Sequence, residues 1–379
     1  MTTRRAMGWL PALVLLAACA GPPELPTRYG VPEIDLTADT DRRSVVDQDT
    51  AQYLGHPSTV LLEDGRTMLL AYPEGHGRGA VVYRRSHDAG RTWSDRLPVP
   101  DNWSTSQEVP TLYRVVDPNG VRRVIMFSGL YPIRMAVSED DGGYWSALEP
   151  IGDFGGIVAM SSVERLKDGS YMAFFHDDGR FFAEGGEAGQ FRVYTTASDD
   201  GGLTWSAPRE ILTHPDLDLC EPGVVRSPDG DELAMLLREN SRASGRSFVS
   251  FSQDEGQTWS EPQLLPEALT GDRHTLRYLT DGSLLVVFRD MGTDETTRGD
   301  WLSWIGSYED LHAQEPAGTR LRLMDNTNPW DSTYPGVEVL PNGDVVTTTY
   351  GHWGEGLPPY IVSIRLTAEE LAGYSTGRQ

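Results

Sequence analysis

Lysine, cysteine and long apolar runs are all scarce in this chain of 379 residues. Lys167 is the one lysine, and 32 basic residues face 56 acidic residues, which gives a formal net charge of −24. No basic cluster is longer than two residues, so the chain lacks the positive footprint that releases counterions from nucleic acid. We therefore expect no nucleic-acid partner. Nearly all positive charge is arginine, whose planar fork suits carboxylates.

The N-terminal residues have the pattern of an export signal. A short basic start precedes an apolar run over 10–18, which is too short to span a bilayer. The run ends in Leu-Ala-Ala-Cys, which resembles the bacterial lipobox and implies that Cys19 is diacylated. We predict a signal peptide over 1–18, a lipidated cysteine and tether over 19–32, and a folded part over 33–379. The expected location is the bacterial cell envelope, lipid-anchored at the outer membrane or in the periplasm, or else secreted.

The two cysteines of this chain are not expected to form a disulfide with each other. If Cys19 carries lipid, Cys220 has no partner and no intramolecular disulfide can form. With 40 glycines, 25 prolines and 39% hydrophobic residues, the chain is rich in turns but can still build a sizeable core. A disordered or collagen-like protein is thereby excluded.

The rest of the chain repeats every 50–60 residues. Four octets of the pattern S-x-D-x-G-x-[TY]-W start at Ser86, Ser138, Ser198 and Ser252. Six Asp-Gly or Asn-Gly turns separate β-rich apolar runs, which is the strongest short-range signal for a hairpin. Within an octet the aspartate can hold a tight turn while the tryptophan packs between sheets. The repeat predicts an all-β fold, a six-bladed β-propeller with four-stranded blades.

Ring closure has to come from the N-terminal side, because the sixth blade lacks an octet. We expect residues 33–36 to supply its outer strand, and a helical tail over 367–373 to cap the edge. The fifth blade has only a degenerate octet at 307–310. We expect a monomer.

These octets resemble the Asp-box of the sialidase superfamily, and the resemblance covers roughly residues 50–366. It implies a carbohydrate substrate and an exo-acting glycoside hydrolase. Sialidases use a tyrosine nucleophile, because the carboxylate on the anomeric carbon of sialic acid would repel an anionic one. A glutamate deprotonates the tyrosine, arginines bind the substrate carboxylate, and an aspartate protonates the leaving group.

Several segments resemble the strands that carry these groups. The last blade begins Asp-Ser-Thr-Tyr-Pro-Gly-Val, which implies that Tyr334 is the nucleophile. The segment Cys-Glu-Pro-Gly-Val-Val implies that Glu221 is its base, and the hairpin that follows supplies Arg238. Arg298, 36 residues before Tyr334, resembles a second carboxylate-binding arginine. Arg134 is either an added anion ligand or a surface ion-pair partner.

The first blade departs from the family pattern. Gly55 stands where the family has an arginine, and the segment 73–79 lacks the acid aspartate. Both departures fall where the family binds the substrate carboxylate and the leaving group, so the sugar stays open. The candidates to supply the missing acid are His56, His76, Asp177 and Glu74.

Five histidines fall at equivalent positions of the blades and are expected to meet near the axis: His56, His76, His176, His274 and His352. Histidine beside arginine and tyrosine suits acid–base work near neutral pH. We count His176, His274, His352 and Arg273 as substrate-binding candidates. No pair has H-x-x-x-H or C-x-x-C spacing, so we predict neither a metal nor a cofactor.

Three functions follow from this pattern. The first is a retaining exo-glycoside hydrolase that releases an acidic terminal sugar. The second is a polysaccharide lyase on uronate-containing glycans, in which a tyrosine and a histidine abstract a proton beside a carboxylate that arginine neutralises. The third is a non-catalytic glycan-binding lipoprotein, which would need no paired Glu221 and Tyr334.

Overall fold

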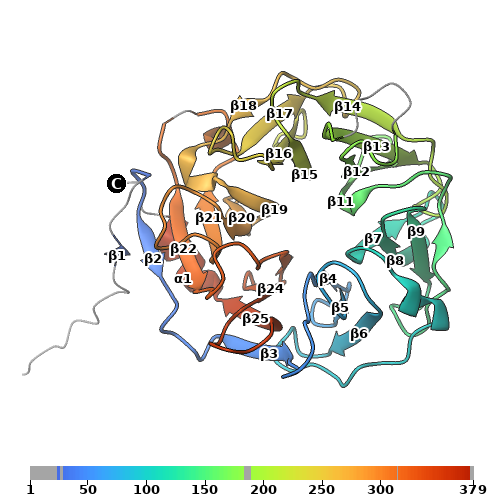
Figure 1. Ribbon diagram of the computed structural model, residues 1–379, viewed down its shortest axis with the longest axis horizontal. Coiled ribbons are helices and arrows are strands. Elements are labelled where there is room, and N and C mark those ends of the chain that lie inside the picture. The colour runs from blue at the N-terminus through green and yellow to red at the C-terminus, as the bar shows by residue number, and fades with distance from the viewer. Residues whose placement is uncertain (1–23, 26–28, 183–188, 314, 376–379) are drawn as a thin grey trace, which may run out of the picture.

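The chain forms a ring of antiparallel sheets around a central axis (Figure 1). The computed structural model describes residues 24–25, 29–182, 189–313 and 315–375. The predicted signal peptide and Cys19 lie outside the described residues. Within the described part of the chain, no helix is long and apolar enough to cross a membrane.

Each blade starts with a strand near the axis and continues outward. The first blade has three strands, β4 (Ser58–Leu61), β5 (Met68–Pro73) and β6 (Val81–Ser86). The second has β7 (Thr111–Val116), β8 (Arg122–Ser128), β9 (Arg134–Ser138) and β10 (Glu149–Pro150). The third has β11 (Ile157–Arg165), β12 (Tyr171–Asp177), β13 (Arg192–Ser198) and β14 (Arg209–Thr213).

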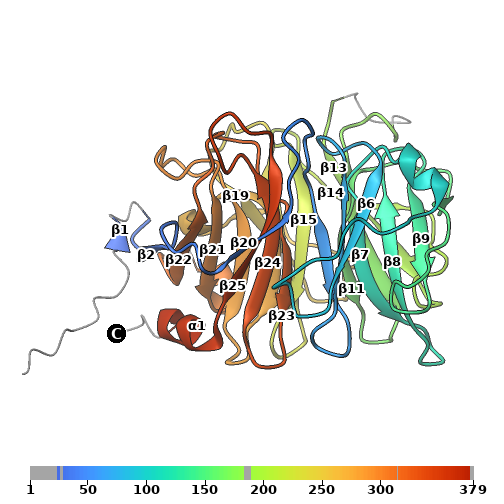
Figure 2. The same cartoon turned by 90° about the horizontal axis from the view of Figure 1, so that it is seen from below.

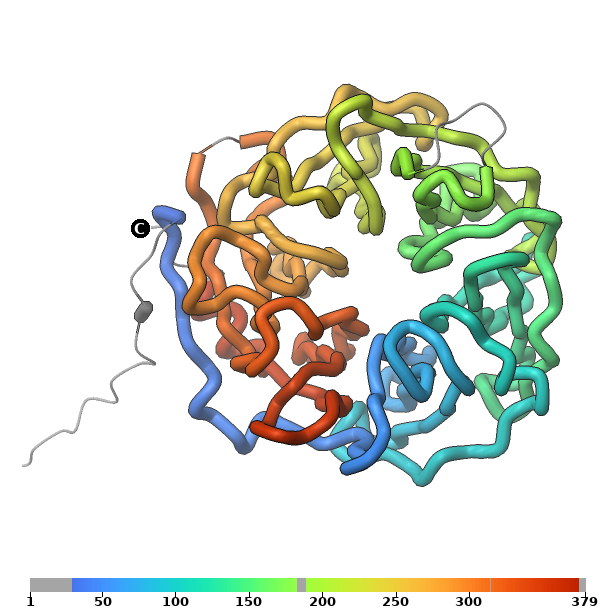
Figure 3. The backbone as a smooth tube through the Cα atoms, viewed as in Figure 1, coloured from blue at the N-terminus to red at the C-terminus, as the bar shows by residue number. Residues whose placement is uncertain are grey.

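The second half of the ring repeats this plan, as the colour order in Figure 3 shows. The fourth blade has β15 (Leu219–Arg226), β16 (Leu233–Glu239), β17 (Phe248–Ser252) and β18 (Gln263–Leu264). The fifth has β19 (Gly271–Tyr278), β20 (Leu284–Asp290), β21 (Trp301–Gly306) and β22 (Thr319–Met324). The sixth has β23 (Gly336–Val339), β24 (Val345–Gly351), β25 (Tyr360–Leu366) and β3 (Arg43–Asp47). The predicted six-bladed β-propeller is confirmed.

The prediction that residues 33–36 close the ring is wrong. β2 (Glu33–Asp35) instead runs parallel to β22 on the fifth blade, and β1 (Glu24–Leu25) pairs with β2. β3 closes the sixth blade by pairing with β25. Figure 1 shows β2 beside β22 and β3 beside β25. The N-terminal segment therefore covers one blade before it completes the next.

The end of β3 also ties the sixth blade to the first. The Asp47 carboxylate accepts a hydrogen bond from Tyr72 and forms ion pairs of 2.8 Å with both Arg84 and Arg96. Val46 is buried beside Tyr72. These contacts explain why residues 43–47, and not 33–36, complete the ring.

The four octets adopt one turn geometry. In each, the aspartate accepts the backbone N–H four residues on, at 2.9 Å for Asp88, 2.8 Å for Asp140, 3.0 Å for Asp200 and 2.8 Å for Asp254. The octet serine accepts the N–H of a glycine at 2.8 to 2.9 Å. The octets are thus folding devices on the outer part of the ring.

The core lies between blades instead of at one centre. Trp145 of the second octet packs edge-on against Tyr83 of the first blade, with ring centroids 5.7 Å apart. Other apolar clusters likewise join neighbouring sheets. The helix α1 (Ala368–Ser375) buries Leu371 against the fifth and sixth blades, on the face that Figure 2 shows at the bottom. The predicted helical tail is thereby found. Because neighbouring sheets pack tightly against one another, the ends of the inner strands are held in place around the axis.

Candidate active site

Tyr334 and Glu221 meet where two inner strands begin. The Tyr334 hydroxyl donates a hydrogen bond of 2.5 Å to Glu221 Oε1, and only 8% and 3% of the two residues' surfaces are exposed. Tyr334 lies two residues before the start of β23, and Glu221 lies at a β-bulge between β15 and β16. Bulges re-aim side chains at such sites. The two residues that the resemblance paired are therefore in direct contact.

The same backbone feature recurs around the ring. Five of the inner strands carry, within three residues of their start, a residue other than glycine with a positive φ between 47° and 55°: His56, Val158, Glu221, Arg273 and Thr333. Such a conformation costs of order 1–3 kcal/mol for each residue and persists where the surroundings fix it. Left-handed backbone at five equivalent positions turns side chains toward a shared space at one end of the axis.

Arginine keeps Glu221 ionised. Arg238 Nη1 donates to Glu221 Oε1 at 2.8 Å. Burial raises the pKa of Glu221, but the Arg238 charge, the hydrogen bond from Tyr334 and the Arg289 charge together lower it below its usual value. Burial and the Glu221 charge raise the pKa of Tyr334 well above 10. At neutral pH the pair is a phenol that donates to a carboxylate, which is the ground state of a nucleophile with its base.

A buried aspartate organises the arginines. Asp272 is fully buried and pairs with Arg242 at 2.6 Å and with Arg289 at 2.5 Å, while Arg238 Nε lies 3.5 Å away. Arg289 also donates to the carbonyl of Ser332 at 3.0 Å. The arginines are thereby fixed in place beside the Tyr334–Glu221 pair.

Arg273 lies over the ring of Tyr334. Its guanidinium carbon lies 5.6 Å from the centroid of the Tyr334 ring, and its Nη1 donates to the carbonyl of Ser161 at 3.0 Å. A cation over the ring face is attracted by the negative face of the π system. Arg273 was a substrate-binding candidate, and the structure brings it to Tyr334.

His56 is held neutral with both ring nitrogens engaged. Its Nδ1 accepts the Gly77 N–H at 3.2 Å, so the ring proton is on Nε2, which lies 3.1 Å from the Tyr350 hydroxyl. The Tyr350 hydroxyl in turn donates a hydrogen bond to Asp331 Oδ1 at 3.2 Å. Burial lowers the pKa of His56 well below 6.5. Its ring centroid is 4.5 Å from that of Tyr334, so the two rings pack against each other.

Asp331 gathers the groups at the rim. It accepts a hydrogen bond from Tyr53 at 2.8 Å and lies 3.3 Å from His76 Nδ1 and 2.9 Å from His352 Nε2. These partners come from the first and sixth blades. Although burial opposes it, hydrogen bonds from His76, His352 and Tyr53 hold the pKa of Asp331 below its usual range. His76 and His352 are thus placed at the rim by one carboxylate.

His176 faces the same space from the third blade. Its Nδ1 accepts the backbone N–H of Glu221 at 3.4 Å, and its ring stacks on Phe191. Burial lowers its pKa to about 4, so the ring is neutral above that pH, with its proton on Nε2. His176 is a fixed hydrogen-bond donor.

These groups line a cavity of about 290 Å³, close to the lower end of the range of roughly 300–1,000 Å³ for small-molecule sites. The predicted residues on its wall are His56, His76, His176, Glu221, Arg238 and Tyr334. Arg78, Glu108, Asp178 and Arg180 also line it.

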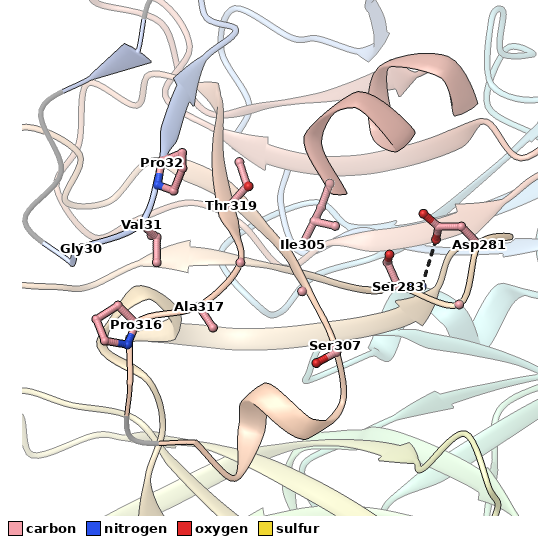
Figure 4. Close-up of a pocket in the computed structure, with 13 residues that line it drawn as sticks. Gly30, Val31, Pro32, Asp281, Ser283, Ile305, Ser307, Pro316, Ala317 and Thr319 are labelled. Carbon is pink, nitrogen blue, oxygen red and sulfur yellow. Dashed lines mark hydrogen bonds between the residues drawn. The ribbon is translucent and has the colours of Figure 1, made fainter. Parts of the chain in front are cut away.

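A larger hollow of about 510 Å³ lies at the turns of the fifth blade (Figure 4). The titratable residue among those that line it, Asp281, is bound to the Ser283 N–H of its own turn. Its lining offers no catalytic group, so the smaller cavity is the candidate active site.

Other predicted residues lie away from this cavity. The Asp177 carboxylate holds a turn by accepting the N–H groups of Gly179 and Phe181. His274 Nε2 lies 2.9 Å from the carbonyl of Leu269, and its ring stacks on Phe288.

Two predicted arginines also have other partners. Arg298 approaches the carbonyls of Met291 and Gly292 at 3.5 and 3.4 Å. Arg134 binds the side chain and carbonyl of Thr105 at 2.8 and 2.7 Å. Neither lines the cavity. Glu74, a candidate for the missing acid, pairs with Arg96.

Sequence reasoning missed Glu108, Arg289 and Asp331. A local signal for Glu108 exists, because prolines stand directly before three inner strands, at 57, 110 and 335, and in the first half of a fourth, at 222. His56, Glu221 and Tyr334 each precede such a proline, and Glu108 lies two residues before Pro110. Arg289 and Asp331 have no such signal, since their partners are distant in sequence.

The fold and the paired tyrosine and glutamate define an Asp-box β-propeller with an enzyme-like cavity. The BNR repeat-like domain family matches residues 172–345. A sialidase of Clostridium perfringens is 23% identical over 326 residues, which cover 80% of this chain and 69% of that protein.

Solved structures agree on the architecture. An α-L-arabinanase of Penicillium chrysogenum complexed with arabinobiose is 16% identical, with a TM-score of 0.65 over 87% of this chain and 98% of its own. An intramolecular trans-sialidase of Ruminococcus gnavus in complex with oseltamivir carboxylate is 15% identical, with a TM-score of 0.59 over 86% of this chain and 97% of its own. These structures share the fold of this chain. The chain thus contains a region similar to the BNR repeat-like domain family, is similar to sialidases over most of its length, and shares the β-propeller fold of these solved structures.

Proposed function

We propose that this protein is a retaining, exo-acting glycoside hydrolase that releases an acidic terminal sugar from glycans outside the cytoplasm. The observation that carries the proposal is the 2.5 Å hydrogen bond from Tyr334 to Glu221 at the wall of the cavity. Arg238 supports it by keeping Glu221 ionised. A binding protein would have no use for a buried phenol held against a carboxylate.

In the first half of the reaction, the Tyr334 oxygen forms a bond to the anomeric carbon while its proton moves to Glu221. The bond between that carbon and the glycosidic oxygen breaks, and the leaving oxygen takes up a proton. In the second half, water attacks the anomeric carbon and gives one proton to the group that had protonated the leaving oxygen, the bond to Tyr334 breaks, and Glu221 returns its proton to the phenolate. Two displacements at one carbon retain its configuration.

The acidic sugar follows from the nucleophile and from the arginines around it. A neutral phenol avoids the repulsion that a carboxylate nucleophile would meet at an anomeric carbon bearing a carboxylate. Arg238, Arg273 and Arg289 surround Tyr334, and arginine binds carboxylates through two parallel hydrogen bonds. Asp272 neutralises part of this charge, so a neutral sugar such as the arabinose of the arabinanase relative is the competing substrate.

The full-length protein is tested on 4-methylumbelliferyl α-sialoside, on 4-nitrophenyl α-L-arabinofuranoside, and on uronate polysaccharides followed by absorbance of unsaturated products. We expect hydrolysis of the sialoside. Tyr334→Phe should lower kcat/KM by at least about 10³-fold, since it removes the nucleophile. Glu221→Gln should lower it by about 10²–10⁴-fold, since it removes the base.

The matched control is Tyr83→Phe, which removes another buried phenol in the interface between the first two blades and should leave the rate unchanged. Arabinofuranoside cleavage that depends on Tyr334 would keep the hydrolase and replace the acidic sugar. Unsaturated products that depend on Tyr334 would make the protein a lyase. A lack of activity on every one of these substrates would contradict the proposal that the protein is an enzyme of this class.

A further inference from the structure

The proposed reaction needs a proton donor for the leaving group, and the predicted donors do not fill this role well. Asp177 is bound to the amides of its own turn. Both nitrogens of His56 are engaged, by Gly77 and by Tyr350. His76 lines the cavity, but its Nδ1 lies toward Tyr53 and Asp331. Among the described residues that line the cavity, Glu108 is the carboxyl group that has no ion-pair partner.

Glu108 lies in the connection from the first blade to β7, where the backbone is well fixed. Its Oε1 accepts the backbone N–H of Val109 at 3.0 Å. Its carbonyl accepts the Ser106 hydroxyl at 3.1 Å, and that hydroxyl lies 2.8 Å from the hydroxyl of Ser128 on β8. The carboxyl group is therefore held in place by the second blade and does not swing freely from a loop.

Two glycines make room for this side chain. A Cβ atom on Gly129 would come within 2.8 Å of Glu108 Cγ, and one on Gly77 within 3.3 Å of Glu108 Oε1. The first distance is shorter than real contacts allow, so any larger residue at position 129 would displace the carboxyl group. Gly77 is also the residue whose N–H fixes His56. The same short segment of the first blade thus borders both Glu108 and the ring that packs on Tyr334.

Glu108 and Glu221, two of the carboxyl groups on the cavity wall, have opposite electrostatic environments. Burial raises the pKa of Glu108 and the negative charge of Glu221 adds to this, while hydrogen bonds from the Val109 and Val158 amides and the Arg78 charge oppose the rise without cancelling it. Arg238 lowers the pKa of Glu221. Pairs of titratable groups whose surroundings push their pKa values apart mark acid and base assignments.

We propose that Glu108 is the general acid of this site, which protonates the glycosidic oxygen as its bond to the anomeric carbon breaks. This inference rests on the proposed hydrolase function. The proton leaves the Glu108 carboxyl group, the aglycone departs as a neutral alcohol, and Glu108 becomes a carboxylate. In the second half, that carboxylate takes a proton from the attacking water, and Glu108 returns to its acid form.

The test compares leaving groups on one glycone in the full-length protein. Glu108→Gln should lower kcat/KM by about 10²–10⁴-fold on sialyllactose, whose leaving alcohol needs a proton. The loss should shrink to less than about tenfold on 4-nitrophenyl sialoside, whose phenol leaves without one. If the arabinofuranoside proves to be the substrate, arabinobiose and the 4-nitrophenyl arabinofuranoside take these places. Azide, a nucleophile that needs no deprotonation, should speed turnover of the aryl glycoside by the variant.

Two further variants separate the outcomes. Gln107→Ala changes a neighbouring residue on the same cavity wall and should affect both leaving groups by the same factor. His76→Gln should do likewise, and a loss confined to the alcohol leaving group in this variant would make His76 the acid. Equal losses for Glu108→Gln on both leaving groups, or none on either, would overturn the assignment while the wild-type protein remains a hydrolase. A wild-type protein that cleaves no glycoside would instead remove the proposed function itself.

Discussion

Asp272 is a buried carboxylate that three arginines share. It contacts Arg242, Arg289 and Arg238, and none of its surface is exposed. Removing one member of a buried ion-pair group leaves the others as uncompensated charges, which costs about 3–5 kcal/mol. The same group holds the arginines that surround Tyr334, so stability and the site depend on one side chain.

Asp272→Asn should lower the free energy of unfolding by about 3–5 kcal/mol at pH 7, measured by urea titration. Although burial opposes it, Arg238 and Arg289 hold the pKa of Asp272 below its usual value. A depressed pKa gives stability that is present above the unfolded value of about 3.9 and lost as the pH falls toward the folded value. The gap between variant and wild type should therefore persist at pH 5 and narrow only below about pH 4.

The control is Asp95→Asn, which changes an exposed carboxyl group and should stay within about 0.5 kcal/mol of the wild type. A pH-independent gap, or a gap equal to that of the control, would show that the Asp272 charge does not matter.

The residues of the site differ in whether a short stretch of sequence is enough to identify them. Tyr334 and Glu221 stand in short contiguous motifs that resemble those of the sialidase family, so the resemblance implies their pairing, and they touch in the structure. Arg298 has a suitable spacing before Tyr334, yet the neighbouring carbonyls are its partners, while Arg289 reaches Asp272 and the carbonyl of Ser332. Spacing along the chain does not report which side of a strand end faces the axis.

At the scale of elements, hairpins and octets are local, and ring closure is not. Asp-Gly and Asn-Gly turns fix the pairing of adjacent strands, so the six blades follow from the sequence. Residues 33–36 and 43–47 are both short polar–apolar segments that suit an edge strand. What selects 43–47 is the contact of Asp47 with Arg84 and Arg96 of the first blade, which no local pattern reveals.

Closure by β3 predicts a contrast between two neighbouring valines. Val46 is buried beside Tyr72, while Val45 is 57% exposed on the other face of the same strand. Val46→Ser should cost about 2–3 kcal/mol, because it removes apolar burial and leaves a hydroxyl in its place. Val45→Ser is the matched control and should change stability by less than about 0.5 kcal/mol. Equal effects in urea unfolding would mean that β3 does not close the ring.

At the scale of the whole molecule, the net negative charge of the chain contrasts with the positive charge of the arginines at the site. The formal charge of −24 repels acidic glycans over long distances, while arginines gather around Tyr334. A local positive field in a cavity can still attract an anion at close range, and salt screens the long-range repulsion. We therefore expect the rate of sialoside hydrolysis to rise with ionic strength at low salt.

The predicted N-terminal signal bears on where the proposed reaction would take place. We propose that Cys19 carries lipid and holds the ring at a membrane, on the basis of the Leu-Ala-Ala-Cys segment. In a bacterial host, the wild-type chain should partition into the detergent phase of Triton X-114 and incorporate labelled palmitate. Cys19→Ala should do neither, because one thiol is the acceptor. Cys220→Ala is the control, since that thiol is buried in the fourth blade and should have no part in lipidation. Aqueous partition of the wild-type chain would contradict the anchor and leave a secreted or periplasmic enzyme whose ring and site are unchanged.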